Sequence, residues 1–256
     1  MTAEFLTADP LSGLPHGFFT RRGGVSAGGF ATLNCSLSGQ DDPERVAINR
    51  ARAMEALGLP PESLSGVHQV HGIAVAEVTA PIPNGARPQA DALVTRQPGL
   101  ALGVVTADCG PVLFADRKAG VVGAAHSGWR GAVAGMLEAT LDAMERLGAH
   151  RADIAAVVGP CIRQDSYEVG ADLRDAVLAQ NAEAERFLIA ARRPGHWLFD
   201  LPGYCAARLV AAGAGMVGVI ATDTFADAER FFSHRRRTLN GEGPIGHQLS
   251  AIALPR

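Results

Sequence analysis

Residues 100–126 read LALGVVTADCGPVLFADRKAGVVGAAH, and this stretch decides the fold class. It contains three short apolar runs, LALGVV, VLFAD and VVGAAH, which the turn sequences DCGP and RKAG separate. Apolar runs of this length, bounded by turn residues, are typical of buried β-strands. We therefore expect core strands here, with Cys109 in a turn and His126 at the end of the last strand.

Helical patterns flank these strands on both sides. Apolar residues recur at helical spacing from Val133 to Leu147, and Gly148 is a typical helix terminator. Earlier in the chain, Asp42-Pro43-Glu44 has the residues of a helix start, and the periodic stretch that follows stops at Gly58. The sequence also predicts helices at about 171–190 and 202–212, and strands at about 154–158 and 216–222.

This mixture of elements predicts an α/β or mixed α+β fold. The chain has 256 residues and 47% apolar content, which is enough to bury one large core. It shows no internal repeat and no long linker. We therefore expect a single domain over residues 1–256.

Charge and composition exclude several classes of protein. The formal net charge of −3 gives no basic field that would attract nucleic acid. No apolar run reaches the roughly 18 residues of a membrane span, and the N-terminus lacks the regions of a signal peptide. We expect a cytoplasmic protein with neither a nucleic-acid nor a membrane partner, and a monomer. The absence of a CxxC pair argues against a disulfide framework or a zinc knuckle among the four scattered cysteines, Cys35, Cys109, Cys161 and Cys205.

Cys109 and His126 are the first candidates for chemistry. Both lie where a predicted strand meets a turn, and loops at strand ends often carry function. If the two strands are neighbours, both side chains open on the same end of the sheet. Such a pair is either part of a metal site or a nucleophile with its base.

Two histidines in the segment VHQVHG, His68 and His71, are the next candidates. Their spacing allows both to be ligands or both to be ordinary surface residues. The sequence has no HExxH motif, no phosphate-binding Walker loop and no zinc-deaminase pattern. Any metal site must therefore be assembled from distant segments.

Six motifs closely resemble the YfiH family, whose members are called laccase-domain proteins, polyphenol oxidases or bacterial purine nucleoside phosphorylases. The motifs follow the family order along almost the whole chain: TRRGGVSAGGFATLN (20–34), QVHG (69–72), TADCGPV (106–112), AHSGWRG (125–131), VGPCI (158–162) and FFSHRR (231–236). The resemblance implies a fold with central mixed β-sheets and outer helices. It also implies that His71, Cys109 and His126 bind one metal ion, usually zinc, and that His68 is not a ligand.

The activity that this resemblance implies is phosphorolysis of adenosine, guanosine, inosine and methylthioadenosine, with an adenosine deaminase side activity. Two imidazoles and one thiolate leave a fourth zinc position open, as in catalytic zinc sites. Phosphorolysis also needs a phosphate site. Our first candidate is Arg130, and further candidates are Arg21, Asn34 and Arg50.

Neighbouring residues receive weaker assignments. Asp91 and Asp108 could orient the ligand histidines through hydrogen bonds. The run Arg235-Arg236-Arg237 is expected to be a solvated face, and Trp129 to be a core residue rather than a platform for a base.

Three other functions remain open. The first is a copper-dependent phenol oxidase, since thiolate and imidazole ligands also suit copper. The repeated HxH pairs of familiar multicopper oxidases are absent, however. The second is a metal-free cysteine hydrolase in which His126 activates Cys109, including a factor that edits peptidoglycan precursors. The third is a binding module with a structural metal, which the open coordination position disfavours.

Overall fold

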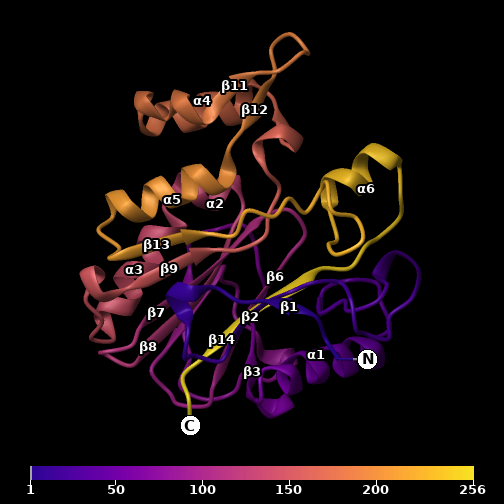
Figure 1. The fold of residues 1–256 in the computed structure, drawn as a ribbon, viewed down its shortest axis with the longest axis vertical. Coiled ribbons are helices and arrows are strands. Elements are labelled where there is room, and N and C mark those ends of the chain that lie inside the picture. Colours follow the sequence, from indigo (N-terminus) through magenta and orange to yellow (C-terminus); the bar gives the residue numbers. More distant parts are fainter. Residues whose placement is uncertain (1) are drawn as a thin grey trace.

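Two β-sheets pack face to face at the centre of the molecule, in a computed structural model that describes residues 2–256 (Figure 1). One sheet has five strands in the order β1-β2-β14-β6-β3, and the other has six in the order β13-β9-β7-β8-β5-β4. Both contain parallel and antiparallel pairs. The fold is therefore mixed α/β with central mixed sheets, which confirms the predicted fold class.

The strands of the two central sheets are short. The five-stranded sheet contains β1 (Phe5–Leu6), β2 (His16–Phe19), β14 (Gln248–Ala253), β6 (Ala101–Thr106) and β3 (Leu64–Ser65). The six-stranded sheet contains β13 (Met216–Val219), β9 (Ala155–Val158), β7 (Gly110–Asp116), β8 (Val121–Ser127), β5 (Ala92–Thr95) and β4 (Val75–Glu77). The three strands predicted within residues 100–126 are β6, β7 and β8.

Alternation along the strands divides the interior into layers. In β7, Leu113 faces the core between the two sheets, whereas Phe114 faces the core beneath the helices. In β6, Leu102 faces the core between the sheets and Ala101 faces the opposite side. Successive strand residues point to opposite faces, so both sheets are buried on both faces.

Helices cover the outer face of each sheet (Figure 1). On the six-stranded sheet lie α2 (Trp129–Ala134), α3 (Met136–Arg146) and α5 (Leu201–Ala211). On the five-stranded sheet lies α1 (Pro43–Ala56), whose Met54 packs in the same cluster as Leu249 of β14. No helix among residues 2–256 is both long enough and apolar enough to cross a bilayer.

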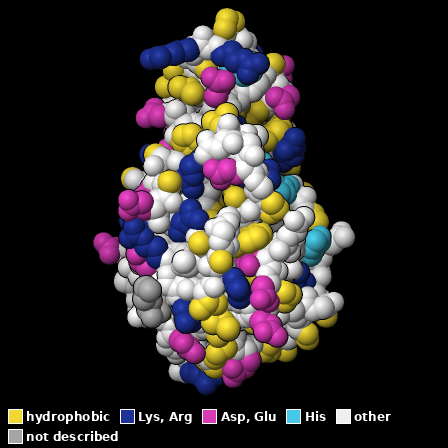
Figure 2. Space-filling model, turned by 90° about the vertical axis from the view of Figure 1, so that its right-hand side faces the viewer, with side chains coloured by type: hydrophobic (Ala, Val, Ile, Leu, Met, Phe, Trp, Pro, Cys, Tyr) yellow, Lys and Arg dark blue, Asp and Glu magenta, His cyan; other side chains and the backbone are white. Residues whose placement is uncertain are grey.

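A third sheet forms one end of the molecule together with α4 (Ala171–Gln180) (Figures 1 and 2). Its strands are β10 (Glu168–Val169), β12 (Trp197–Phe199) and β11 (Leu188–Ala190). The last helix, α6 (His234–Asn240), lies beside the central sheets. Short 3₁₀ helices complete the chain: Asp9–Leu11, Gly28–Phe30, Pro61–Ser63, Asn84–Ala86, Arg151–Asp153, Gln164–Ser166 and Ala182–Phe187.

Three sequence predictions need correction at this level. The helix expected across residues 133–147 is broken, because Gly135 takes a left-handed conformation with φ 101° between α2 and α3. The helix expected at about 171–190 ends at Gln180, because Asn181 is extended and its side chain accepts a hydrogen bond from Glu183 N. The strand expected at 216–222 ends at Val219.

Candidate metal centre

The pairing of β7 with β8 brings Cys109 next to His126. The two strands are antiparallel neighbours, with Pro111 opposite His126 and Gly110 opposite Ser127. Cys109 directly precedes β7, so it lies at the end of the sheet where β8 finishes. The conditional prediction that both residues open on one end of the sheet is confirmed.

Asp91 joins His71 to this pair. It directly precedes β5, is fully buried, and its Oδ1 accepts a hydrogen bond of 2.8 Å from Nδ1 of His126. The same carboxylate accepts hydrogen bonds from three successive backbone amides, those of Val70, His71 and Gly72. These bonds hold His71 in a left-handed conformation with φ 60°. The predicted hydrogen bond from Asp91 to a candidate ligand histidine is therefore present, and the ligand role of that histidine stays a prediction.

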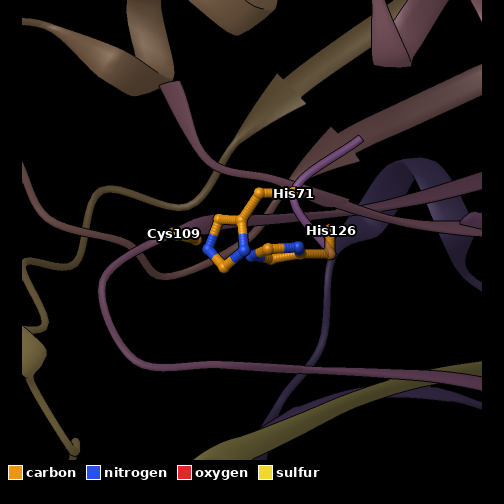
Figure 3. A group of neighbouring side chains, drawn as sticks. All are labelled: His71, Cys109 and His126. Carbon is orange, nitrogen blue, oxygen red and sulfur yellow. The ribbon is translucent and has the colours of Figure 1, made fainter. Parts of the chain in front are cut away.

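The three side chains converge on one point (Figure 3). One ligand atom from each of His71, Cys109 and His126 lies within 4.8 Å of the other two. The imidazole rings of His71 and His126 meet edge to face, with centroids 4.7 Å apart. Gly128 leaves the necessary room, because a Cβ there would lie 2.9 Å from Sγ of Cys109.

The electrostatics favour a thiolate in this position. Burial raises the pKa of Cys109, but the charges and hydrogen bonds of His126 and His71 outweigh it and lower that pKa to about 6. Burial lowers the pKa of His126, whereas Cys109 and Asp91 raise it, and the net direction is upward. Without a metal, the site therefore holds a thiolate beside an imidazolium at neutral pH.

The donor set fits a metal ion. Asp91 accepts the proton of Nδ1 of His126, which leaves the lone pair of Nε2 for a metal. Two imidazoles and one thiolate are ligands that zinc and copper both accept. His71, Cys109 and His126 could therefore hold one metal ion.

A cavity of about 570 Å³ opens beside the three side chains. Its polar lining includes the arginines Arg87, Arg130 and Arg235, and the carboxylate of Asp108. Its apolar lining includes Trp129, Ile162, Tyr167 and Leu201. Pockets of this size and mixed lining are typical of sites for small molecules.

Known proteins resemble this chain over almost its whole length. Residues 15–255 match the family model described as multi-copper polyphenol oxidoreductase laccase. A purine nucleoside phosphorylase of Deinococcus radiodurans is 42% identical over 96% of this chain and 92% of its own. The purine nucleoside phosphorylase PA4543 of Pseudomonas aeruginosa is 40% identical over 87% of this chain and 88% of its own. The crystal structure of YfiH from Bacillus licheniformis superposes with a TM-score of 0.86, at 30% identity, over 93% of this chain and 92% of that one.

This chain belongs to the YfiH laccase-domain family. The motif resemblance in the sequence is therefore confirmed.

The four phosphate-site candidates lie in different places in this family member. Arg130 lines the cavity. Arg21 lies outside the lining, donates to Ala31 O and stacks on a phenyl ring. Arg50 also lies outside it and donates to Cys35 O. Asn34 is buried behind the cavity wall, where its Oδ1 accepts hydrogen bonds from the backbone amides of two lining residues, Ser36 and His247.

Asp108 has a different role from the predicted one. Its carboxylate does not bond a ligand histidine but accepts hydrogen bonds from the hydroxyls of Thr224 and Ser233 and from the backbone amide of Arg235. Asp108 itself is left-handed, with φ 85°. It ties the turn that carries Cys109 to the start of α6.

The arginine run at 235–237 is not simply a solvated face, because all three residues are half-buried. Arg236 donates to the carbonyls of Thr224, Phe225 and Phe231. Arg235, which was expected on a solvated face, lines the cavity. The sequence around Arg235 does not indicate a place in the cavity, because the residues that Arg235 contacts lie far away in the sequence. Trp129 packs partly against the core, as predicted, and also lines the cavity.

Proposed function

We propose that this protein is a zinc-dependent purine nucleoside phosphorylase with an adenosine deaminase side activity. The observation that carries the proposal is the position of the His71, Cys109 and His126 group in a cavity lined by three arginines. Relatives at 40% identity or more over most of the chain, named as purine nucleoside phosphorylases, support the same activity.

The cavity charge suits phosphate. None of its arginines, Arg87, Arg130 and Arg235, forms an ion pair within residues 2–256. The lining carboxylate of Asp108 is already occupied by three donors. The lining thus has three arginines against the one carboxylate of Asp108, and this excess of positive charge suits an anionic substrate.

The metal ligands are His71, Cys109 and His126 in this proposal. Zinc held by these three side chains would supply a Lewis acid beside the cavity. Asp91 holds the loop of His71 and the ring of His126 in place, and Gly128 keeps space free beside Sγ of Cys109.

The reaction is a transfer of the ribosyl group. An oxygen of phosphate forms a bond to C1′ of the ribose while the bond from C1′ to the purine nitrogen breaks. The electron pair of that bond stays on the base, which takes up the proton that phosphate gives up. The products of inosine are hypoxanthine and ribose 1-phosphate. Guanosine, adenosine and methylthioadenosine react in the same way.

The apolar lining suits the other part of the substrate. The aromatic side chains of Trp129 and Tyr167 line the cavity together with the buried Ile162 and Leu201, and such apolar groups suit a purine base. The proposal includes a monomeric protein in the cytoplasm, with no nucleic-acid or membrane partner, as expected from the sequence.

Two rivals share the same residues. A copper-dependent polyphenol oxidase is suggested by the description of the family model. Within residues 2–256, however, histidines, cysteines and carboxylates gather in one such group only, whereas a multicopper enzyme needs several. A cysteine hydrolase, including a peptidoglycan-editing factor, is suggested by the lowered pKa of Cys109 beside His126.

The first experiment measures the metal content of the protein purified without added metal. It then measures base release from inosine and adenosine, with and without phosphate, for wild type, Cys109→Ala and Cys205→Ala. We expect about one zinc per chain and phosphate-dependent base release, both lost in Cys109→Ala only. Ammonia release from adenosine tests the deaminase activity. Active protein with copper, or metal-free protein that releases no base, would overturn the proposal.

A further inference from the structure

Arg235 has an unusual combination of contacts for a cavity residue. Its Nη1 donates to the carbonyl of Glu168 at 2.8 Å, and its guanidinium lies 5.4 Å from the ring centroid of Tyr167. Its backbone amide donates to Asp108 at 2.7 Å. The contacts with Glu168 and Tyr167 fix the guanidinium of Arg235, and the bond to Asp108 fixes its backbone. The remaining N–H donors of the guanidinium have no protein acceptor within the described chain.

Arg130 lines the same cavity from another element. It follows the end of β8, whereas Arg235 lies at the start of α6. Burial and the Cys109 thiolate raise the pKa of Tyr167, and the charges of Arg235 and Arg130 counteract them. Arg235, Arg130, Tyr167 and Cys109 all line the cavity. Arg130 stacks on Trp129 at 4.5 Å and has no hydrogen-bond acceptor among residues 2–256.

We propose that Arg235 and Arg130 form an oxyanion subsite of the cavity, beside Tyr167 and Cys109, and that its ligand is a tetrahedral phosphate group. Guanidinium groups suit this ligand because their planar fork donates two parallel hydrogen bonds to phosphate oxygens. A guanidinium already fixed by protein contacts loses little conformational entropy when it binds. Asp108 is a positioning residue, since it holds the backbone of Arg235.

The subsite deepens the proposed function, because phosphorolysis requires free phosphate in the same cavity as the nucleoside. The phosphate group of a nucleotide has the same chemistry and is the other possible source. The volume of about 570 Å³ accommodates either. Binding of inorganic phosphate and of inosine 5′-monophosphate to the zinc-loaded protein separates the two sources.

The test is isothermal titration of inorganic phosphate into zinc-loaded full-length protein at constant ionic strength, without nucleoside. Variants are Arg235→Gln, Arg235→Lys, Arg130→Gln and the matched control Arg192→Gln, which removes an exposed arginine outside the cavity lining. We expect phosphate affinity to fall about tenfold or more in Arg235→Gln and Arg130→Gln, because charge-assisted hydrogen bonds are lost. Arg235→Lys should retain only part of the wild-type phosphate affinity, because lysine keeps the charge but lacks the planar fork. Arg192→Gln should bind phosphate as the wild type does.

Kinetics distinguish phosphate binding from a purely structural role. In Arg235→Gln we expect a higher KM for phosphate with little change in the KM for inosine and with full zinc content. If Arg235→Gln does not fold, Arg130→Gln gives the answer, because Arg130 makes no protein hydrogen bond that folding could need. Wild-type protein that binds neither phosphate nor the nucleotide, or arginine variants that bind phosphate as wild type does, would refute the subsite.

The subsite and the proposed function can fail separately. Phosphate binding that depends on Arg235, without nucleoside cleavage, would keep the subsite and reject the phosphorylase. Phosphate-dependent cleavage with an unchanged phosphate KM in both arginine variants would keep the phosphorylase and reject the subsite. Binding of the nucleotide but not of inorganic phosphate, weakened in both arginine variants, would keep the subsite, assign it to a nucleotide phosphate and reject its role in phosphorolysis.

Discussion

At the scale of single residues, Asp91 holds the two histidines of the site together. One carboxylate bonds the ring of His126 and the backbone of residues 70–72, so it fixes both the imidazole and the loop that carries His71. Its complete burial makes these bonds strong, because no water competes for the carboxylate. The geometry of the metal site therefore depends on a residue that is not itself a ligand.

Replacing Asp91 with Asn is expected to lower zinc affinity about 10- to 100-fold, as for other partners of ligand histidines. The amide has nearly the same shape but loses the charge and presents a donor to the amides of Val70 and Gly72. A competition titration with a zinc chelator measures the affinity. The matched control is Asp116→Asn, because Asp116 is equally buried and accepts from backbone amides at the opposite end of β7. Equal affinity losses in both variants would mean a general effect on folding.

The pKa of Cys109 predicts how the metal-free protein reacts with iodoacetamide. A thiol whose pKa is lowered to about 6 is a thiolate above that pH, so alkylation should rise to half its maximum near pH 6. Below this pH the thiol is protonated and the rate falls. The other cysteines are buried and their pKa values are raised, so they should stay unmodified in the folded protein. Mass spectrometry locates the label, and a midpoint near the ordinary 8.5 would contradict this electrostatic picture.

The sequence predicts the reactive residues better than their surroundings. Cys109 and His126 stand next to predicted strand ends, so their meeting follows once β7 and β8 are neighbours. The strand that follows Asp91, β5, was not predicted from the sequence. Arg235 could not be assigned to the cavity, because its position depends on contacts with Asp108 and Glu168, both more than sixty residues away in sequence.

At the scale of elements, the start of a helix or the position of a strand was predictable where neighbouring residues in the sequence determine it. Asp42 caps α1, because its side chain accepts a hydrogen bond from Glu44 N. Pro43 follows it at the first position of the helix. The end of α4 was missed, because the residues after Gln180 are compatible with a helix, whereas in the structure Asn181 is extended and caps the 3₁₀ helix that follows. The local side-chain cap of Asn181, rather than helix propensity, decides that end.

Asp42→Ala is expected to destabilise the protein by about 1 kcal/mol, because it removes the cap of α1. Urea denaturation measures the free energy of unfolding. Asp172→Ala serves as its control, since this exposed first-turn acid of α4 makes no side-chain hydrogen bond within the described chain. A loss in Asp42→Ala no larger than in the control would show that the cap contributes little.

At the scale of the whole molecule, the packing of two sheets against each other aligns the strand ends that form the site. The core between them contains Leu102 from one sheet and Leu93 and Leu113 from the other. The existence of a mixed sheet fold was predictable from the strand runs. The order of the strands was not, because pairing such as β14 with β6 joins residues that lie far apart in sequence.

Leu113→Ala is expected to lower the free energy of unfolding by about 2–5 kcal/mol, since it leaves a cavity between the sheets. Leu113 is completely buried, whereas Leu239 is 67% exposed, so Leu239→Ala should change the stability by no more than about 0.5 kcal/mol. Denaturant unfolding of both variants gives the comparison. Similar small losses in the two variants would contradict the importance of this core.

The central claim is that the cavity transfers a ribosyl group to phosphate, and ³¹P NMR tests it most directly. Zinc-loaded protein is incubated with inosine and inorganic phosphate, and the phosphate signals are followed together with free hypoxanthine. Our account predicts that ribose 1-phosphate appears in the same amount as hypoxanthine, while inorganic phosphate falls equally. Release of hypoxanthine with no loss of inorganic phosphate would show hydrolysis instead, and no release at all would contradict a nucleoside-cleaving role for the site.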